Sequence, residues 1–210
     1  MENTISDILS SYKEQYAKTF PAPGPRLPVA LASEQDTMCR LQVLQELYVE
    51  RRGRRFILDD STKEYIRKVA SWLMNSKKRG LLLMGTLGNG KTTMLNSIYR
   101  LFGGYKATIG NAQGIFDHFK TTQGSMKYWD EDLLLIDDLG IEPPRCVTFG
   151  EENYPLSKLL LHRYDRCLTT VIATNLDLAQ LEDRYGDRVT DRLFETFELI
   201  VYDNASYRRV

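Results

Sequence analysis

The segment "GTLGNGKTT" at positions 85–93 directly follows the apolar run "LLLM" at positions 81–84. It fits the pattern G-x-x-x-x-G-K-[ST], which is much more specific where it joins a strand to a helix, as the flanking sequence predicts here. Gly85, Gly88 and Gly90 permit positive φ angles, so that successive backbone N–H groups can point at one anion. The segment therefore predicts a phosphate-binding loop.

Two side chains of this loop have defined chemistry. Lys91 supplies a positive charge for the β- and γ-phosphates, and the hydroxyl of Thr92 is placed to bind Mg²⁺. The helix that begins near Lys91 adds the positive end of its dipole. We therefore expect ATP and Mg²⁺ as cofactors. The expected nucleotide-binding residues are Gly85, Thr86, Leu87, Gly88, Asn89, Gly90, Lys91, Thr92 and Thr93.

Polar residues end two further apolar runs. "LLLIDDLG" (133–140) places Asp137 and Asp138 after a buried strand, and "VIATN" (171–175) ends in Asn175. Ligands of open α/β sheets bind at the carboxyl ends of the strands. We expect Asp137 to hold Mg²⁺, Asp138 to orient or deprotonate the attacking water, and Asn175 to hold that water or the γ-phosphate.

Arginines near the C-terminus are the remaining candidates. Arg188 and Arg192 are four residues apart and share one face of a predicted helix. Either one could reach the γ-phosphate of a neighbouring subunit, or both could simply pair with Asp187 and Asp191 on the surface. Arg208 follows the last predicted strand and could fold back toward the nucleotide or belong to a disordered basic tail.

The pattern from residue 80 onward is an alternation of short apolar strands and amphipathic helices. Strands apolar throughout indicate a parallel sheet covered on both faces, and hence an α/β fold with five strands. The predicted strands are 81–84, 105–109, 133–137, 168–174 and 198–202, and the predicted helices are 91–102, 112–121, 153–165, 177–184 and 187–195.

Residues 1–79 predict a small helical N-terminal region ahead of an ATPase core at 80–210. Residues 1–20 have helical periodicity, "PAPGPRLP" (21–28) is a linker, and further helices begin near Ser33 and at Asp60. From residue 51 to 79 there are ten basic and three acidic residues. Such a stretch predicts nucleic-acid binding, and the alternative is a solvated helix face.

Bulk composition excludes several classes of protein. The 210 residues contain 28 Lys and Arg and 28 Asp and Glu, so the net charge is zero. Three widely spaced cysteines and two histidines predict neither a disulfide framework nor a zinc site. The sequence has no signal-peptide pattern and no apolar run of membrane-spanning length, so we expect a cytoplasmic protein with no membrane partner.

Together these motifs resemble the AAA+ superfamily, specifically the DnaC/IstB-like clade of helicase loaders and transposition helper ATPases. The resemblance covers residues 80–210 and identifies "GTLGNGKTT" as Walker A and "LLLIDDLG" as Walker B. It implies that Asn175 is sensor 1, Arg192 is the likelier arginine finger with Arg188 beside it, and Arg208 of "SYR" (206–208) is a sensor-2-like residue. It also implies an ASCE sheet without a C-terminal helical lid.

The resemblance implies an oligomeric ATP switch that loads a replicative DNA helicase, with single-stranded DNA as a further partner. Asp138 replaces the commoner glutamate, which suggests slow hydrolysis. The 23 residues 110–132 leave little room for a two-helix insertion that touches DNA. The alternatives are an IstB-like transposition helper, a P-loop small-molecule kinase, and a nucleotide-binding adaptor that hardly hydrolyses ATP.

Overall fold

The computed structural model describes residues 5–17, 24–25, 27–28, 30–122, 124–125, 127–148 and 150–208. Residues 21–23 and 26 of the predicted linker 21–28 lie outside these ranges. The helices are α1 Ile5–Ala17, α2 Glu34–Glu50, α3 Asp60–Asn75, α4 Lys91–Leu101, α5 Ala112–Thr121, α6 Pro155–Asp165, α7 Leu178–Tyr185 and α8 Asp187–Thr196. The strands are β1 Gly80–Gly85, β2 Ala107–Asn111, β3 Leu133–Leu139, β4 Cys146–Thr148, β5 Glu151–Asn153, β6 Thr169–Thr174 and β7 Phe197–Tyr202.

The centre of the molecule is a five-stranded parallel sheet with the order β2-β3-β6-β1-β7. The strand β6 therefore lies between β1, which leads into the phosphate loop, and β3, which carries the two aspartates. The prediction of a parallel sheet of five strands is therefore confirmed. The carboxyl ends of β1, β3 and β6 consequently meet at one edge of the sheet.

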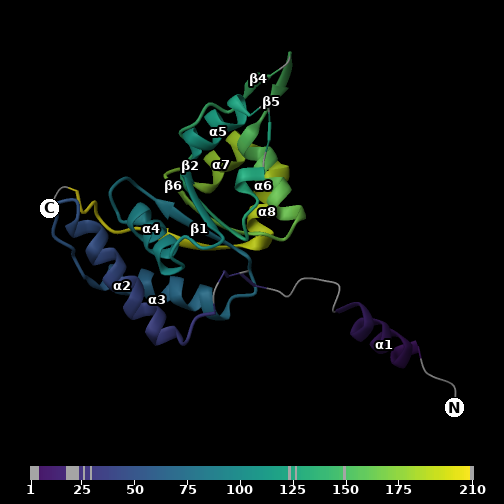
Figure 1. The fold of residues 1–210 in the computed structure, drawn as a ribbon, viewed down its shortest axis with the longest axis horizontal. Coiled ribbons are helices and arrows are strands. Elements are labelled where there is room, and N and C mark those ends of the chain that lie inside the picture. Colours follow the sequence, from purple (N-terminus) through teal and green to yellow (C-terminus); the bar gives the residue numbers. More distant parts are fainter. Residues whose placement is uncertain are drawn as a thin grey trace.

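Helices cover both faces of the sheet (Figure 1), which explains why its strands are apolar throughout. Successive side chains of a strand point to opposite faces. Leu81 and Leu83 accordingly pack with α2, α3 and α4, whereas Leu82 packs with α5, α6, α7 and α8. All three leucines are at most 3% exposed, so the predicted α/β class is confirmed.

The helices α2 and α3 pack on the same face as α4 and share its core, through buried residues such as Leu41, Val69 and Trp72. Ser33 caps α2 as expected, with its hydroxyl accepting a hydrogen bond from the Asp36 N–H at 3.1 Å. The predicted boundary between residues 79 and 80 stays a prediction. None of the described helices is both long and apolar enough to cross a membrane.

The structure differs from the predicted elements in two places. The second strand is Ala107–Asn111 rather than 105–109, because Tyr105 and Lys106 belong to the turn after α4. An antiparallel hairpin, β4–β5, follows β3 and projects from the molecule (Figure 1); its three-residue strands are too short to give a periodic pattern. Between β2 and β3, the described residues form one α-helix, α5, and a 3-10 turn at Lys127–Trp129.

A buried arginine joins the loop before β3 to the strand β6. Arg163 is 1% exposed and donates to the carbonyls of Trp129 at 2.6 Å, Glu131 at 3.0 Å and Thr169 at 2.6 Å. Its Nε also donates to the hydroxyl of Thr170 at 2.9 Å. Burial lowers the pKa of the Arg163 guanidinium to about 10. This side chain therefore aligns β3 with β6 through two buried carbonyl groups and one that is part-buried.

Replacing Arg163 with Met should destabilise the protein strongly, because the substitution removes the guanidinium donor from the buried carbonyls of Trp129 and Thr169 and from the part-buried carbonyl of Glu131. We expect a loss of about 3–5 kcal/mol in the free energy of unfolding, measured by urea denaturation. Arg166 is the matched control on the same helix end, since its ion pair with Asp130 is half exposed. Arg166→Met should cost at most about 1 kcal/mol. Equal effects of the two substitutions would contradict the role of Arg163.

Candidate functional site

The predicted phosphate loop joins β1 to α4, and its glycines adopt the backbone conformations that the sequence requires. The φ angles are 152° at Gly85, 85° at Gly88 and 104° at Gly90. Gly90 is the N-cap of α4, so the positive end of the helix dipole faces the loop. A Cβ atom at Gly85 would collide with the carbonyl oxygen of Tyr202. Glycine is therefore required at this position by the lack of space, in addition to the positive φ angle.

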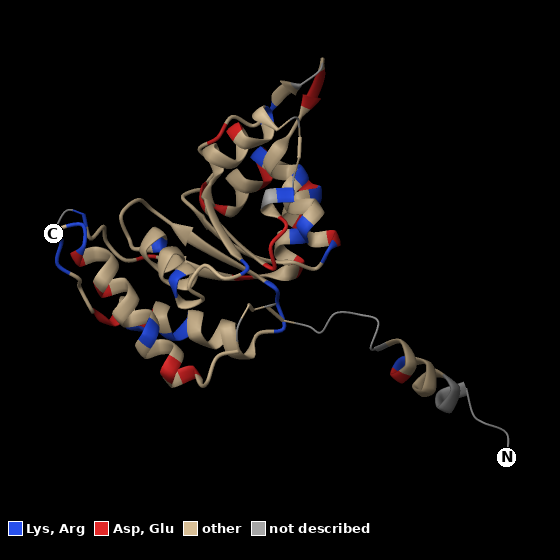
Figure 2. Cartoon of the chain, in the orientation of Figure 1, with Lys and Arg blue, Asp and Glu red and all other residues tan. Residues whose placement is uncertain are grey.

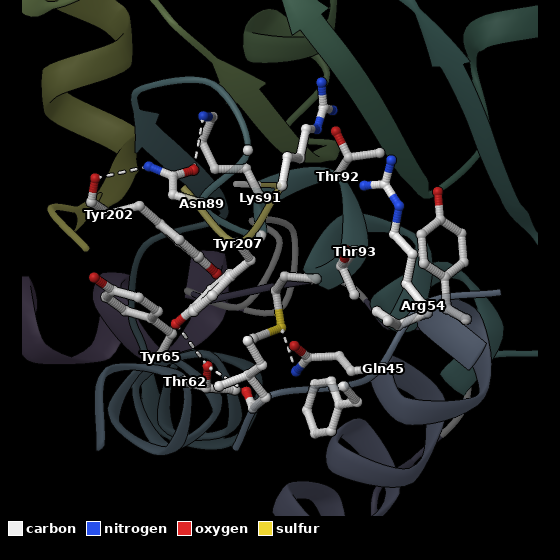
Figure 3. A pocket seen from close by; sticks show the side chains of 18 of the residues that line it. Gln45, Arg54, Thr62, Tyr65, Asn89, Lys91, Thr92, Thr93, Tyr202 and Tyr207 are labelled. Carbon is white, nitrogen blue, oxygen red and sulfur yellow. Dashed lines mark hydrogen bonds between the residues drawn. The ribbon is translucent and has the colours of Figure 1, made fainter. Parts of the chain in front are cut away.

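The ammonium group of Lys91 lies inside this loop. Its Nζ donates to the carbonyls of Gly85 and Thr86, each at 2.7 Å, and to Oδ1 of Asn89 at 3.0 Å. The Asn89 side chain in turn donates to the carbonyl of Tyr202 at 2.9 Å, which ties the loop to β7 (Figure 3). Burial lowers the pKa of Lys91 to about 8, against the opposing effect of Asp138 and Asp137. An anion bound in the loop would favour the charged form of Lys91.

The two predicted magnesium ligands lie together, although Thr92 is in the first turn of α4 and Asp137 is in β3, which does not pair with the strand β1 that leads into α4. The Thr92 hydroxyl donates to Oδ1 of Asp137 at 3.1 Å. Burial raises the pKa of Asp137, and the neighbouring Asp138 carboxylate adds to the rise. A bound cation would offset both effects. Hydroxyl and carboxylate oxygens are the ligands that Mg²⁺ prefers, so these residues fit that ion.

Asp138 has an uncommon backbone conformation. Its φ angle is 51°, and the pairing of β3 with β6 shifts register between Ile136 and Leu139. The irregularity releases the Asp138 side chain from the regular pleat at the site edge of the sheet. The amide of Asn175 lies 3.5 Å from Oδ1 of Asp138, a weak hydrogen bond. The predicted water-activating and sensor residues are therefore adjacent.

A cavity of about 520 Å³ opens beside the loop. Leu87 to Met94, Asp138, Asn175 and Arg208 line it, whereas Gly85 and Thr86 do not. Arg208 lies against Gly88, where an added Cβ would be 3.1 Å from its Cγ. The structure thus places Arg208 at the site rather than in a detached tail. The volume is within the range of small-molecule sites.

The C-terminal segment is held over the cavity by residues that the sequence did not single out. The Tyr207 N–H donates to the carbonyl of Gly88 at 2.9 Å, and its hydroxyl donates to the Asp59 carboxylate at 2.9 Å. The helix α3 begins at Asp60 as predicted, and its N-cap is Asp59, which accepts from the Thr62 N–H at 2.8 Å. The contact between Tyr207 and Asp59 joins residues 148 positions apart, so no local pattern could have revealed it.

The N-terminal region also contributes to the cavity. Its lining includes Gln45, Tyr48, Val49, Arg52, Arg54, Arg55, Phe56, Ile57, Thr62 and Tyr65. Figure 3 shows Arg54 extending toward Thr92 and Thr93 from the side of the cavity opposite Tyr202. The rings of Tyr65 and Tyr202 stack with centroids 4.0 Å apart, which joins α3 to β7 at the cavity wall.

The predicted basic stretch 51–79 is divided over several places in the fold (Figure 2). Lys63, Arg67 and Lys68 form ion pairs with acidic residues on the surface of α3. Lys78 donates to the carbonyls of Phe194 and Phe197, at the far edge of the sheet. Since Arg52, Arg54 and Arg55 line the cavity, the stretch does not form one continuous basic face. Its predicted binding to nucleic acid stays a prediction.

The arginines of α8 lie away from this cavity. The guanidinium of Arg192 is 4.7 Å from the centroid of the Tyr164 ring and pairs with Glu195 at 3.1 Å. It lines a second cavity of about 390 Å³ with Gly80 and Phe197, which begin their strands at the opposite edge of the sheet. Arg188 is exposed, one turn earlier in α8. Neither arginine reaches the phosphate loop of its own chain.

No protein-family model and no curated protein matches the sequence. Solved structures do match. The DnaC helicase loader is 22% identical with a TM-score of 0.52, covering 70% of this chain and 93% of that one. DnaI is 22% identical with a TM-score of 0.55, covering 73% and 88%. DnaA bound to AMPPCP and single-stranded DNA is 20% identical with a TM-score of 0.52, covering 71% and 49%.

These similarities establish the fold. The chain has an AAA+-like α/β fold, which it shares with the structures of DnaC, DnaI and DnaA. The chain spans about half the length of the DnaA structure. At identities of 20–22%, the similarity says nothing about which activity or partner this chain shares with them.

The contact between Thr92 and Asp137 predicts a magnesium requirement. Asp137→Asn should weaken ATP binding about tenfold or more in Mg²⁺ and leave it nearly unchanged in EDTA, because only the metal contact is lost. Thr92→Val should act in the same direction, and the double variant should lose less than the sum of the two. Isothermal titration with and without Mg²⁺ measures each effect. An equal loss in EDTA would show that Asp137 does not act through the metal.

Proposed function

We propose that the chain is an ATP-dependent switch that works as a DnaC-like helicase loader in DNA replication, binding and hydrolysing ATP. The observation that carries the proposal is the meeting of four predicted residues at one sheet edge, with Thr92 bonded to Asp137 and Asp138 beside Asn175. DnaC, a helicase loader, and DnaA, solved with AMPPCP and single-stranded DNA, support it by their shared fold. A replicative helicase and single-stranded DNA are the partners this proposal implies.

The residues of the cavity have separable roles in this proposal. Backbone N–H groups of the glycine loop and the Lys91 ammonium bind the phosphates, which displace the bonds that Lys91 makes to its own loop. Thr92 and Asp137 hold Mg²⁺, which would neutralise charge on the transferred phosphoryl group when bound. Asp138 takes a proton from the water that attacks the γ-phosphorus, and the bond to the β-phosphate oxygen breaks. Asn175 positions the Asp138 carboxylate and that water.

The nucleotide site should separate into a binding part and a hydrolysing part. Lys91→Ala should abolish tight ATP binding, since it removes the charge inside the loop. Asp138→Ala should leave the affinity within about threefold and lower turnover by about 10²–10⁴, the range for a lost general base. ATP titration and phosphate release measure the two effects. Turnover by Asp138→Ala at the wild-type rate would leave the carboxylate without a catalytic role, as expected for a nucleotide-binding adaptor.

Because Arg188 and Arg192 lie away from the cavity of their own chain, the proposal places one of them in a neighbouring subunit's site, within a homo-oligomer formed on ATP binding. Arg192→Ala should bind ATP normally and hydrolyse it about 10³–10⁵ more slowly. Mixing Arg192→Ala with Lys91→Ala should restore part of the activity, because each subunit supplies what the other lacks. The same mixing experiment with Arg188→Ala and Lys91→Ala shows which of the two arginines acts on the nucleotide of the neighbouring subunit.

Specific ATPase activity should also rise with protein concentration as subunits associate. A self-contained P-loop kinase predicts a flat specific activity and no complementation. If neither arginine variant is rescued by Lys91→Ala at any concentration, the site is not shared between subunits.

A further inference from the structure

The linker between α2 and α3, residues 51–59, passes along the mouth of the cavity. In the sequence, the arginines of this linker form a basic run, a pattern that predicts binding to nucleic acid. In the structure, Arg52, Arg54 and Arg55 line the same cavity as Lys91 and Thr92, whereas Arg51 does not. Figure 2 shows basic residues gathered at the end of α2. Arg208, the last described residue, lines the same cavity, so cationic side chains from the N-terminal region and from the C-terminal segment border it together.

Local backbone structure fixes the direction of this linker. Gly53 has a φ angle of 68° and donates to the carbonyl of Glu50 at 2.8 Å, which ends α2 in a tight turn. The Arg52 guanidinium lies 3.6 Å from the centroid of the Tyr48 ring and donates to the Tyr48 carbonyl at 3.3 Å. Arg54 follows the turn and extends along the cavity toward Thr92 (Figure 3). The positive φ at Gly53 thus aims the following residues toward the phosphate loop.

The end of α2 is close to the catalytic edge of the sheet. Helix α2 packs along α4, which begins at Lys91. Tyr48 is 8% exposed, and the Asp137 carboxylate contributes to raising its pKa, after the larger effect of burial. Tyr48 and Val49 of the last turn of α2 line the same cavity as Lys91 and Thr92. The linker that follows lines it too, through Arg52, Arg54 and Arg55.

The charges around the cavity are unbalanced. Five cationic residues line it, Arg52, Arg54, Arg55, Lys91 and Arg208, and one acidic residue, Asp138. Among the residues that the structure describes, no carboxylate is within ion-pair distance of Arg54 or Arg55. Like charges around a partly enclosed space repel each other, and a polyanion in that space removes the repulsion. A nucleoside triphosphate has the required charge and a size suited to a cavity of about 520 Å³.

We propose that Arg54, supported by Arg55, binds the phosphate groups of the nucleotide held by its own chain. The inference rests on the proposed nucleotide site and adds the N-terminal region to it. Since α2 ends and α3 begins at this linker, the phosphate contact connects both helices to the nucleotide. A loss of the terminal phosphate then weakens the contact that holds the linker against the loop.

The test compares Arg54→Gln with Arg51→Gln in the full chain. Both residues are exposed and belong to one basic run, but only Arg54 lines the cavity. We expect Arg54→Gln to weaken ATP binding about tenfold, as for the loss of a charge-assisted hydrogen bond, and AMP binding by less than twofold. Arg55→Gln should have the same selectivity with a smaller effect, and Arg51→Gln should match the wild type. Isothermal titration with ATP, ADP and AMP measures the affinities.

Two results would overturn this inference while the proposed function stands. In the first, Lys91→Ala abolishes ATP binding but Arg54→Gln binds all three nucleotides like Arg51→Gln. In the second, Arg54→Gln keeps its ATP affinity and loses affinity for a single-stranded oligonucleotide, which would assign the linker to DNA. If the wild-type chain binds no ATP, both the inference and the proposed function fail. The thermal unfolding midpoint of Arg54→Gln should lie within about 2 °C of the wild-type value, because the substitution is exposed. This measurement checks that the fold is intact.

Discussion

The hydrogen bond from Thr92 to Asp137 joins the first turn of α4 to β3, which does not pair with the strand β1 that precedes α4. Asp137 is near the carboxyl end of β3, and β6 lies between β3 and β1. Both side chains meet because the three strands are parallel and their carboxyl ends lie at one edge. The same order places Asn175, which follows β6, beside Asp138. Each chemical feature of the site therefore depends on the insertion of β6 between β1 and β3.

Polar groups with little access to water maintain that alignment. Arg163 joins the loop before β3 to β6 at the far end of the strands. At the site end, the Glu142 carboxylate accepts from the Gly140 N–H at 2.9 Å and from the Tyr185 hydroxyl at 2.6 Å. Glu142 is 2% exposed, and its buried charge is also paired with Arg184 at 3.7 Å. These two residues brace β3 at both ends, and the strained Asp138 lies between them.

The cavity wall brings together segments from both ends of the chain. Tyr207 contacts Gly88 and Asp59, and Tyr65 stacks on Tyr202, so the C-terminal segment, the phosphate loop and α3 hold one another. The linker with Arg54 closes the remaining side. A nucleotide in this cavity would contact the N-terminal helices, the sheet edge and the C-terminal segment at once. Its presence would therefore stabilise their common arrangement.

The sequence alone determined the fold class and the local chemistry, since both depend on short-range patterns. Apolar runs of strand length, and glycines that need positive φ before Lys91, predicted the parallel sheet and the phosphate loop. Asp137 and Asp138 were identifiable because they end a buried strand. The tertiary structure decided what depends on distant contacts. It placed Arg208 at the loop and Arg192 at the opposite edge, and it divided the basic stretch between the α3 surface and the cavity. A run of like charges has the same pattern whether it faces solvent, DNA or a nucleotide, and only the packing of α2 along α4 turns Arg54 toward Thr92.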